Sequence, residues 1–371
     1  MATQLVSNTV QPALLFMPDI SGFTEFVTNT EIEHAQSIIQ EVLELLIESN
    51  KLDLKVSEIE GDAIFFYKIG NPPSYTALLE QIQFMFTQFH RHLRLYDLVR
   101  ICPCAACSSA IQLKLKIIAH FGEVSNYSVQ QYNKLFGKDL ITLHRLLKNS
   151  LNKKEYALLT TPLVSSCSEA DHLPGWYKAQ SGSEAYDTGA IDFIVVDLSE
   201  LLAALPEQNP PSSRLSDKTK IAYRLQREIP ASPGMIFGEI FTLSERAKWM
   251  HGVKKIEMIT KDHVNRIGTK HRCFVDPRNN PVIVTDYATV NDNVAELVEM
   301  NENGLGGCRY RVEKIEEHKT RLSIELLVNK NPFITSFFNL FMKKKLMRSL
   351  NLSADNLYSL CTASEGNPQT G

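Results

Sequence analysis

The chain has 371 residues, of which 44% are apolar and 22% are charged. This composition is ordinary for globular proteins and excludes a disordered, collagen-like or membrane-spanning chain. Its 39 basic and 42 acidic residues leave a net charge of −3, which provides no overall positive field for nucleic acid. We therefore expect no nucleic-acid partner, and at roughly 100–200 residues per domain we expect two domains.

The start of the chain and its cysteines favour a cytoplasmic protein. The first residues lack the basic start and the long apolar core of a signal peptide. The longest aromatic and aliphatic stretch, 332–342, is too short to cross a bilayer, so we expect no transmembrane segment. The seven cysteines are an odd number and are scattered apart from one cluster, which does not suit a secreted disulfide framework.

One segment, 205–218, separates the two expected domains. It contains two adjacent prolines among amides and serines and has no apolar periodicity, which is typical of a linker. The sequence therefore predicts a first domain over 1–204, a second domain over 219–362 and a flexible C-terminal tail over 363–371.

The first domain begins with a short apolar run that turn residues close, the pattern of a buried strand. Apolar residues then recur at helical spacing and later alternate on either side of a turn at 60–62. The expected elements are strand 13–17, helix 35–46, strand 52–56, strand 63–67, helix 78–96, strand 113–119 ending at 120–122, a helix near 139–150 and strand 193–196. The β-α-β-β-α-β order of the first six elements is the ferredoxin-like arrangement.

The second domain is expected to be one antiparallel sheet with a long closing helix, which is an α+β layout. The expected elements are strand 221–229, helical residues over 235–250, six strands between 253 and 328, and a helix over 332–360. A sheet that curves around a helix in this way encloses an apolar cavity.

Two aspartates of the first domain stand at strand edges that this fold would place side by side. Asp19 follows the first strand, and Asp62 lies at the tip of the hairpin. Two convergent carboxylates suit a hard cation such as Mg²⁺, with phosphate oxygens completing its shell. The segment 21–24 leads into the helix, whose N-terminal amides can hold a polyphosphate. Aspartate is also common in hairpin turns and as a helix cap, so spacing alone leaves both interpretations open.

Four segments in the order 16–24, 58–63, 119–124 and 135–146 resemble class III adenylate and guanylate cyclase domains, and the resemblance extends over 14–200. It implies a ferredoxin-like, nucleotide-cyclase-type fold, a homodimer, and a nucleoside triphosphate bound with Mg²⁺ or Mn²⁺. It further implies that Asp19 and Asp62 hold two metal ions and that Arg145 reaches the transition state across the dimer interface. The nucleotide-binding residues that it implies are Gly22, Phe23, Thr24, Glu58, Lys116 and Lys134.

Several positions depart from the cyclase pattern. The catalytic asparagine, which precedes the arginine by one helical turn, corresponds to Ile141, and an expected lysine corresponds to Thr188. Glu58 of the base-selecting pair is similar to guanylate cyclases, whereas Lys134 opposite it fits neither nucleotide pattern. Loss of a positioned transition-state group costs roughly 10²–10³ in rate. We therefore favour a degenerate domain that binds metal and nucleotide or dimerises without efficient turnover; the alternative is an active cyclase that the second domain regulates.

Three cysteines, Cys102, Cys104 and Cys107, lie close together between the second helix and the next strand. Such a cluster can bind Zn²⁺ when a fourth ligand joins it. The candidates for this ligand are Cys167, His90, His92 and His120. A redox pair or a buried loop of small residues explains the spacing equally well.

The second domain resembles the START-like, or SRPBCC, helix-grip family, which includes the polyketide cyclase and Bet v 1 types. The segments 246–250, 253–256 and 267–269 and the closing helix carry this resemblance. It implies a cavity for an apolar small molecule, and the dispersed polar residues suggest no catalytic site. The apolar stretch 332–342 precedes three lysines, which suits a helix that covers the cavity or one on a membrane surface. We expect the first, because a closing helix needs an apolar face.

Overall fold

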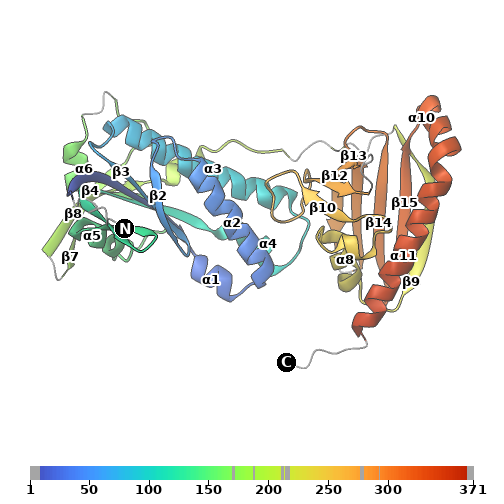
Figure 1. The fold of residues 1–371 in the computed structure, drawn as a ribbon. Helices are drawn as coiled ribbons and strands as arrows, with labels where there is room; N and C mark the ends of the chain where they lie inside the picture. The colour runs from blue at the N-terminus through green and yellow to red at the C-terminus, as the bar shows by residue number, and fades with distance from the viewer. Residues whose placement is uncertain are drawn as a thin grey trace, which may run out of the picture. The chain divides into compact units, whose positions relative to one another are not determined.

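The structure is a computed structural model that describes residues 9–168, 172–186, 189–209, 213, 218–275, 280–291 and 293–365 (Figure 1). The chain forms two compact units. The first combines Met1–Asp97 with Ser108–Gln208, and the second combines Leu98–Cys107 with Asn209–Gly371. The division after Gln208 falls inside the 205–218 segment, parts of which lie outside the described residues, as do the tail beyond 365 and Thr188.

The first unit contains one mixed sheet with the strand order β2-β3-β1-β4-β6-β8-β7, in which β5 pairs with the outer half of β4. The pairing of β4 with β6 is parallel, and the other pairings are antiparallel. Its strands are β1 (Gln11–Ser21), β2 (Lys55–Glu60), β3 (Ala63–Ile69), β4 (Lys114–Val129), β5 (Tyr132–Phe136), β6 (Tyr156–Thr160), β7 (Ala179–Tyr186) and β8 (Gly189–Asp197).

Helices cover both faces of this sheet. The helical elements of this unit are α1 (Phe23–Thr28), α2 (Ile32–Glu48), α3 (Tyr75–Val99), the 3₁₀ helix η1 (Ala110–Gln112), α5 (Lys138–Leu146), α6 (Thr161–Ser166) and α7 (Ser199–Ala203). The short helix α4 (Ala105–Ser109) contains the boundary between the two units. Figure 1 shows α2 and α3 on one side of the sheet and α5 on the other. The chain order β1-α2-β2-β3-α3-β4 agrees with the expected β-α-β-β-α-β arrangement.

The core of this unit follows from the alternation of side chains along a buried strand. Ala13, Leu15 and Met17 on one face of β1 pack in the same cluster as Leu143 and Leu146 of α5. All five side chains are essentially inaccessible to solvent. Because β1 lies at the centre of the sheet and is covered on both faces, it reads in the sequence as a continuous apolar run.

Two expected strand boundaries were wrong. The strand expected from residue 52 begins at Lys55, because Asp53 has a left-handed φ of 54° and Asn50 forms side-chain hydrogen bonds with Leu54. The strand expected to end at 120–122 continues to Val129, because β5 pairs with its second half.

The second unit is built on a fully antiparallel sheet in the order β10-β11-β12-β13-β14-β15-β9. Its strands are β9 (Thr219–Ile229), β10 (Lys255–Met258), β11 (Lys270–Phe274), β12 (Val282–Val290), β13 (Val294–Asn301), β14 (Gly306–Glu316) and β15 (Lys319–Asn329). Its helical elements are α8 (Pro233–Phe241), α9 (Arg246–Trp249), α10 (Pro332–Phe337), the π-helical turn η2 (Phe338–Met342) and α11 (Lys343–Glu365). Figure 1 shows α11 running across this sheet.

This unit has the expected α+β layout of one sheet and one long terminal helix. The helical residues expected over 235–250 form two helices instead, because Thr242 adopts an extended conformation and ends α8. In the described part of the chain, no helix combines the length and the apolar character that a membrane crossing requires.

Candidate functional site

The central feature of the first unit is a pair of carboxylates at one end of the sheet. Strand pairing places Asp19 of β1 opposite Ala63 of β3, directly after Asp62. The amide of Ile20 donates a hydrogen bond to the carbonyl oxygen of Asp62 at 3.0 Å, which ties the hairpin turn to β1. Gly61 permits this turn, because it adopts a left-handed φ of 64° that side chains disfavour. The structure thus brings together two residues that are far apart in sequence.

The electrostatics of the pair reflect this proximity. Burial raises the pKa of Asp19, although the neighbouring Lys116 opposes the shift. Burial and then repulsion from Asp19 raise the pKa of Asp62. Adjacent carboxylates that repel each other are stabilised by a cation, and oxygen ligands of this kind suit Mg²⁺ or Mn²⁺. The residues present therefore fit a divalent metal ion.

Lys116 already supplies one positive charge to this pair. It lies opposite Asp19 in the pairing of β1 with β4, and its Nζ is 3.1 Å from Oδ2 of Asp19. The same ammonium group donates a hydrogen bond to the carbonyl oxygen of Leu147 at 3.0 Å. A fixed lysine beside two carboxylates can contact a phosphate oxygen as well as the metal-binding aspartate.

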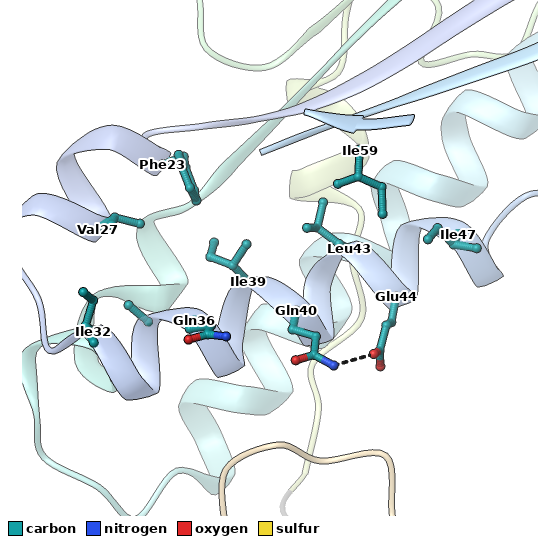
Figure 2. A pocket seen from close by; sticks show the side chains of 11 residues that line it. Phe23, Val27, Ile32, Gln36, Ile39, Gln40, Leu43, Glu44, Ile47 and Ile59 are labelled. Atoms are coloured by element: carbon teal, nitrogen blue, oxygen red, sulfur yellow. Dashed lines mark hydrogen bonds between the residues drawn. The ribbon is translucent and has the colours of Figure 1, made fainter. Parts of the chain in front are cut away.

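The segment after Asp19 forms a turn that leads into a short helix. Gly22 has a left-handed φ of 90° and precedes α1, which is only six residues long. Phe23 is half-buried and Thr24 is exposed. Near these residues lies an apolar groove of about 420 Å³, lined by side chains of α1, α2 and β2. Figure 2 shows Phe23, Leu43 and Ile59 around this groove.

The two residues of the expected base-selecting pair are in contact. Glu58 lies on β2 and Lys134 on β5, and their side chains form an ion pair. A hydrogen bond from Lys134 to Glu58 raises the pKa of the lysine. The sequence suggested that these residues act together, but it did not indicate that they would bond to each other.

Arg145 stands in the last turn of α5, above the ring of Tyr186 at 5.8 Å from the ring centroid. The Tyr186 hydroxyl donates a hydrogen bond to the carbonyl oxygen of Arg145 at 3.1 Å. Ile141, one turn earlier, is 54% exposed and offers no polar atom from its side chain. Helix α5 therefore carries the arginine of the cyclase pattern but not its asparagine.

Three residues of the 119–124 segment have a structural role that sequence reasoning missed. The ring of buried His120 bonds to the Thr160 hydroxyl at 2.8 Å and to Asp139 at 3.2 Å. Burial opposes ionisation of Asp139, but hydrogen bonds from His120 and from the amide of Glu123 outweigh it and lower the pKa of the carboxyl group. Gly122 leaves room for this carboxylate, because a Cβ there would lie 2.3 Å from Asp139 Cγ.

The three clustered cysteines are close enough to share one metal ion. The sulfur atoms of Cys102, Cys104 and Cys107 lie within 4.8 Å of one another. The amide of Cys107 donates a hydrogen bond to Sγ of Cys104 at 3.4 Å. Tetrahedral zinc with Zn–S bonds of about 2.3 Å separates its sulfur ligands by about 3.8 Å, so a small contraction of the loop suffices.

The histidines proposed as the fourth ligand have other partners. Ring nitrogens of His90, His92 and His120 lie within ion-pair distance of carboxylates, at 2.7, 3.3 and 3.2 Å. Burial raises the pKa of Cys167, the remaining candidate, and so disfavours its thiolate form. The three histidine rings are therefore engaged by carboxylates, and the thiolate form of Cys167 is disfavoured.

A second polar cluster, which the sequence did not indicate, is buried in the second unit. Nη1 of Arg246 donates hydrogen bonds to both carboxylate oxygens of Glu299, at 2.8 and 2.7 Å. Both side chains are at most 5% exposed. His271 lies beside them, and burial lowers the pKa of its ring to about 4, so the ring is neutral at pH 7. The site thus holds one paired charge of each sign.

Comparison with known sequences finds relatives of uncharacterised function. A family model described as a protein of unknown function (DUF2652) matches residues 39–156. An uncharacterised protein of Mycobacterium tuberculosis, Rv2561/Rv2562, is 33% identical over 127 residues, which are 34% of this chain and 58% of that protein. The chain therefore spans little more than half the length of this curated relative.

Comparison with solved structures finds likenesses at low sequence identity. The guanylate cyclase domain of RhGC from Catenaria anguillulae in complex with GTP is 15% identical, with a TM-score of 0.38, over 51% of this chain and 97% of that domain. A point mutant of norcoclaurine synthase from Thalictrum flavum is 12% identical, with a TM-score of 0.31, over 40% of this chain and 96% of that enzyme. Both TM-scores are below 0.5, and the function is therefore inferred from the residues of this chain.

Proposed function

We propose that the first unit binds a nucleoside triphosphate through a divalent metal ion and turns it over slowly or not at all. The observation that carries this proposal is the convergence of Asp19 and Asp62: burial raises the pKa of Asp19, and burial followed by repulsion from Asp19 raises the pKa of Asp62. Mg²⁺ or Mn²⁺ would bind these oxygens, neutralise them and accept phosphate oxygens in its remaining positions. Lys116 would hold a further phosphate oxygen.

Weak turnover follows from the composition of α5. Cyclisation requires that the 3′-hydroxyl oxygen attack the α-phosphate and that pyrophosphate leave, and it benefits from donors fixed at the transition state. Ile141 supplies no such donor, and Arg145 is held over Tyr186. The alternative is an active cyclase, in which a second copy of the chain places its Arg145 beside Asp19 and Asp62. The apolar groove supports this alternative as a surface for the second copy, because Ile32 is 73% and Ile59 is 51% exposed there.

The ion pair of Glu58 and Lys134 supports guanine as the base. The guanine edge offers N–H donors to a carboxylate and O6 as an acceptor to an ammonium group, whereas adenine offers the reverse arrangement at these atoms. We expect GTP to bind about tenfold more tightly than ATP in the presence of Mn²⁺. Glu58→Gln should remove most of this preference in a competition binding assay.

The control for this prediction is Glu60→Gln, which changes a carboxylate on the same strand two residues away. Glu60 forms its ion pair with His144, at 3.4 Å, whereas Glu58 forms the ion pair with Lys134. Equal affinity of the wild-type protein for the two nucleotides, or an equal effect of the two variants, would contradict the role of Glu58.

We also propose that Cys102, Cys104 and Cys107 bind Zn²⁺ as thiolates, because their sulfur atoms are clustered within 4.8 Å of one another. A fourth ligand would complete the tetrahedral set. Purified protein should contain stoichiometric zinc by atomic absorption. Cys104→Ser should release it and lower the melting temperature.

Cys273→Ser is the matched control for the zinc proposal, because Cys273 is a buried thiol outside the cluster. It should retain zinc. The zinc site would be contradicted if added zinc did not change the melting temperature of the metal-free protein. It would also be contradicted if the Cys104→Ser variant retained zinc.

For the second unit we propose a START-like, helix-grip pocket for an apolar small molecule. Its single antiparallel sheet and the long helix α11 support this proposal, together with the resemblance of the segments 246–250 and 267–269. Native mass spectrometry of the purified protein should identify the bound ligand by its mass.

A further inference from the structure

An apolar face at the start of the C-terminal helical region is turned to solvent. Phe333 is 86% exposed, Leu340 76%, Phe341 65% and Phe337 56%. The rings of Phe337 and Phe341 pack against each other with centroids 5.1 Å apart. Large apolar side chains that are gathered in this way mark an interaction surface, whereas single exposed ones do not.

The core of the second unit does not use these side chains. Phe338 is buried against two residues of β15, and Ile334, Leu346 and Leu350 pack on the same cluster. These four residues form the sheet-facing stripe of α10, η2 and α11. The outward residues of the stretch 332–342 therefore take no part in covering the sheet.

Basic residues flank the exposed apolar face at both ends. Lys343, Lys344 and Lys345 follow it directly, and Lys344 and Lys345 are exposed. At its other end, the amide of Lys330 bonds to the carbonyl oxygen of Lys218 at 2.6 Å, which places two further lysines together. An apolar patch between clusters of positive charge complements a surface that is negative outside and apolar beneath.

We propose that this face binds the surface of an anionic lipid bilayer. The helical segment would lie in the plane of the interface, with Phe333, Phe337, Leu340 and Phe341 in the outer acyl region and the lysines among the headgroups. The positive charge distinguishes this occupant from a second copy of the chain, which would bring like charges together. Attachment of this kind is peripheral and reversible, and it is independent of nucleotide binding by the first unit.

Vesicle co-sedimentation of the full chain tests the proposal. The wild-type protein should bind phosphatidylcholine vesicles that contain phosphatidylserine, and binding should fall with added salt. Replacing Lys343, Lys344 and Lys345 by Gln should weaken binding about 100-fold, since each lysine near an anionic surface contributes about a factor of five. Phe337→Ser combined with Phe341→Ser should weaken it to a similar extent, about 100-fold.

The matched control is Ile259→Ser combined with Tyr287→Ser, which removes two apolar side chains that are 46% and 42% exposed elsewhere in the second unit. It should leave vesicle binding unchanged. The proposal would be overturned by absent binding to anionic vesicles or by equal effects of the test and control variants. It would also be overturned if sedimentation equilibrium showed that the wild-type protein is a dimer and that the double variant of Phe337 and Phe341, but not the control variant, is a monomer.

Discussion

Asp62→Asn should abolish the stabilisation of the protein by metal and GTP while it raises the melting temperature of the metal-free protein. The second effect follows from the folded state, in which burial and Asp19 disfavour the ionised Asp62 and raise its pKa. A neutral amide removes this penalty at pH 7 but also removes a metal ligand. A residue with a purely structural role would not produce opposite effects with and without ligand.

The expected loss of ligand-induced stabilisation follows from the coupling between ligand binding and folding. A ligand present at 100 times its dissociation constant stabilises the folded state by about 2.7 kcal/mol. For a protein unit of about 200 residues this corresponds to a rise in melting temperature of about 5–10 °C. Asp62→Asn should show none of this rise in differential scanning fluorimetry.

Asp192→Asn is the matched control, because Asp192 is an exposed aspartate of the same unit on β8. It should retain the full shift with Mn²⁺ and GTP. If Asp62→Asn retains the shift as well, the carboxylate pair does not bind the metal.

Glu299→Gln should destabilise the second unit by about 3–5 kcal/mol. The change leaves the guanidinium of Arg246 buried without a countercharge, and this side chain is only 1% exposed. The variant also weakens the two hydrogen bonds from Nη1 of Arg246. Urea unfolding followed by the fluorescence of buried Trp249, with Trp176 replaced by Phe, would report this unit.

An exposed ion pair provides the comparison. Arg311 and Glu313 are 2.8 Å apart, with side chains 45% and 29% exposed. Glu313→Gln should therefore cost about 0.2–1 kcal/mol at most. Replacing Arg246 by Met and Glu299 by Leu together should recover much of the loss, because both desolvated charges are then removed. A cost below 1 kcal/mol for Glu299→Gln would contradict the assigned pairing.

The sequence predicts the elements of this protein that have a strong periodic pattern. The continuous apolar run of β1 and the helical spacing of α2 correspond to a central strand and an amphipathic helix. Asp19 and Asp62 could be paired in advance because a β-α-β-β order brings their strands together. The strand β5 was missed because its five residues are too few to show a periodic pattern, although Leu135 packs in the core.

Long-range polar contacts could not be predicted from local patterns. Arg246 and Glu299 are distant in sequence, and only the register of β13 against its neighbours places the carboxylate under α9. The same limit applies to the stretch 332–342, where eight of eleven residues, proline included, are apolar. Periodicity cannot state which side of such a helix meets the sheet, and the outward position of Phe333 and Phe341 emerges only from the fold.

Calorimetric titration of GTP into the purified protein, with and without Mn²⁺, tests the central claim most directly. We expect GTP to bind only when Mn²⁺ is present and to bind at least 100-fold more weakly to Asp62→Asn than to the wild-type protein. Little or no cyclic nucleotide should accumulate in the wild-type sample. Binding that is independent of the metal ion or of Asp62, or the absence of nucleotide binding under all conditions, would contradict a metal-dependent nucleotide site at Asp19 and Asp62.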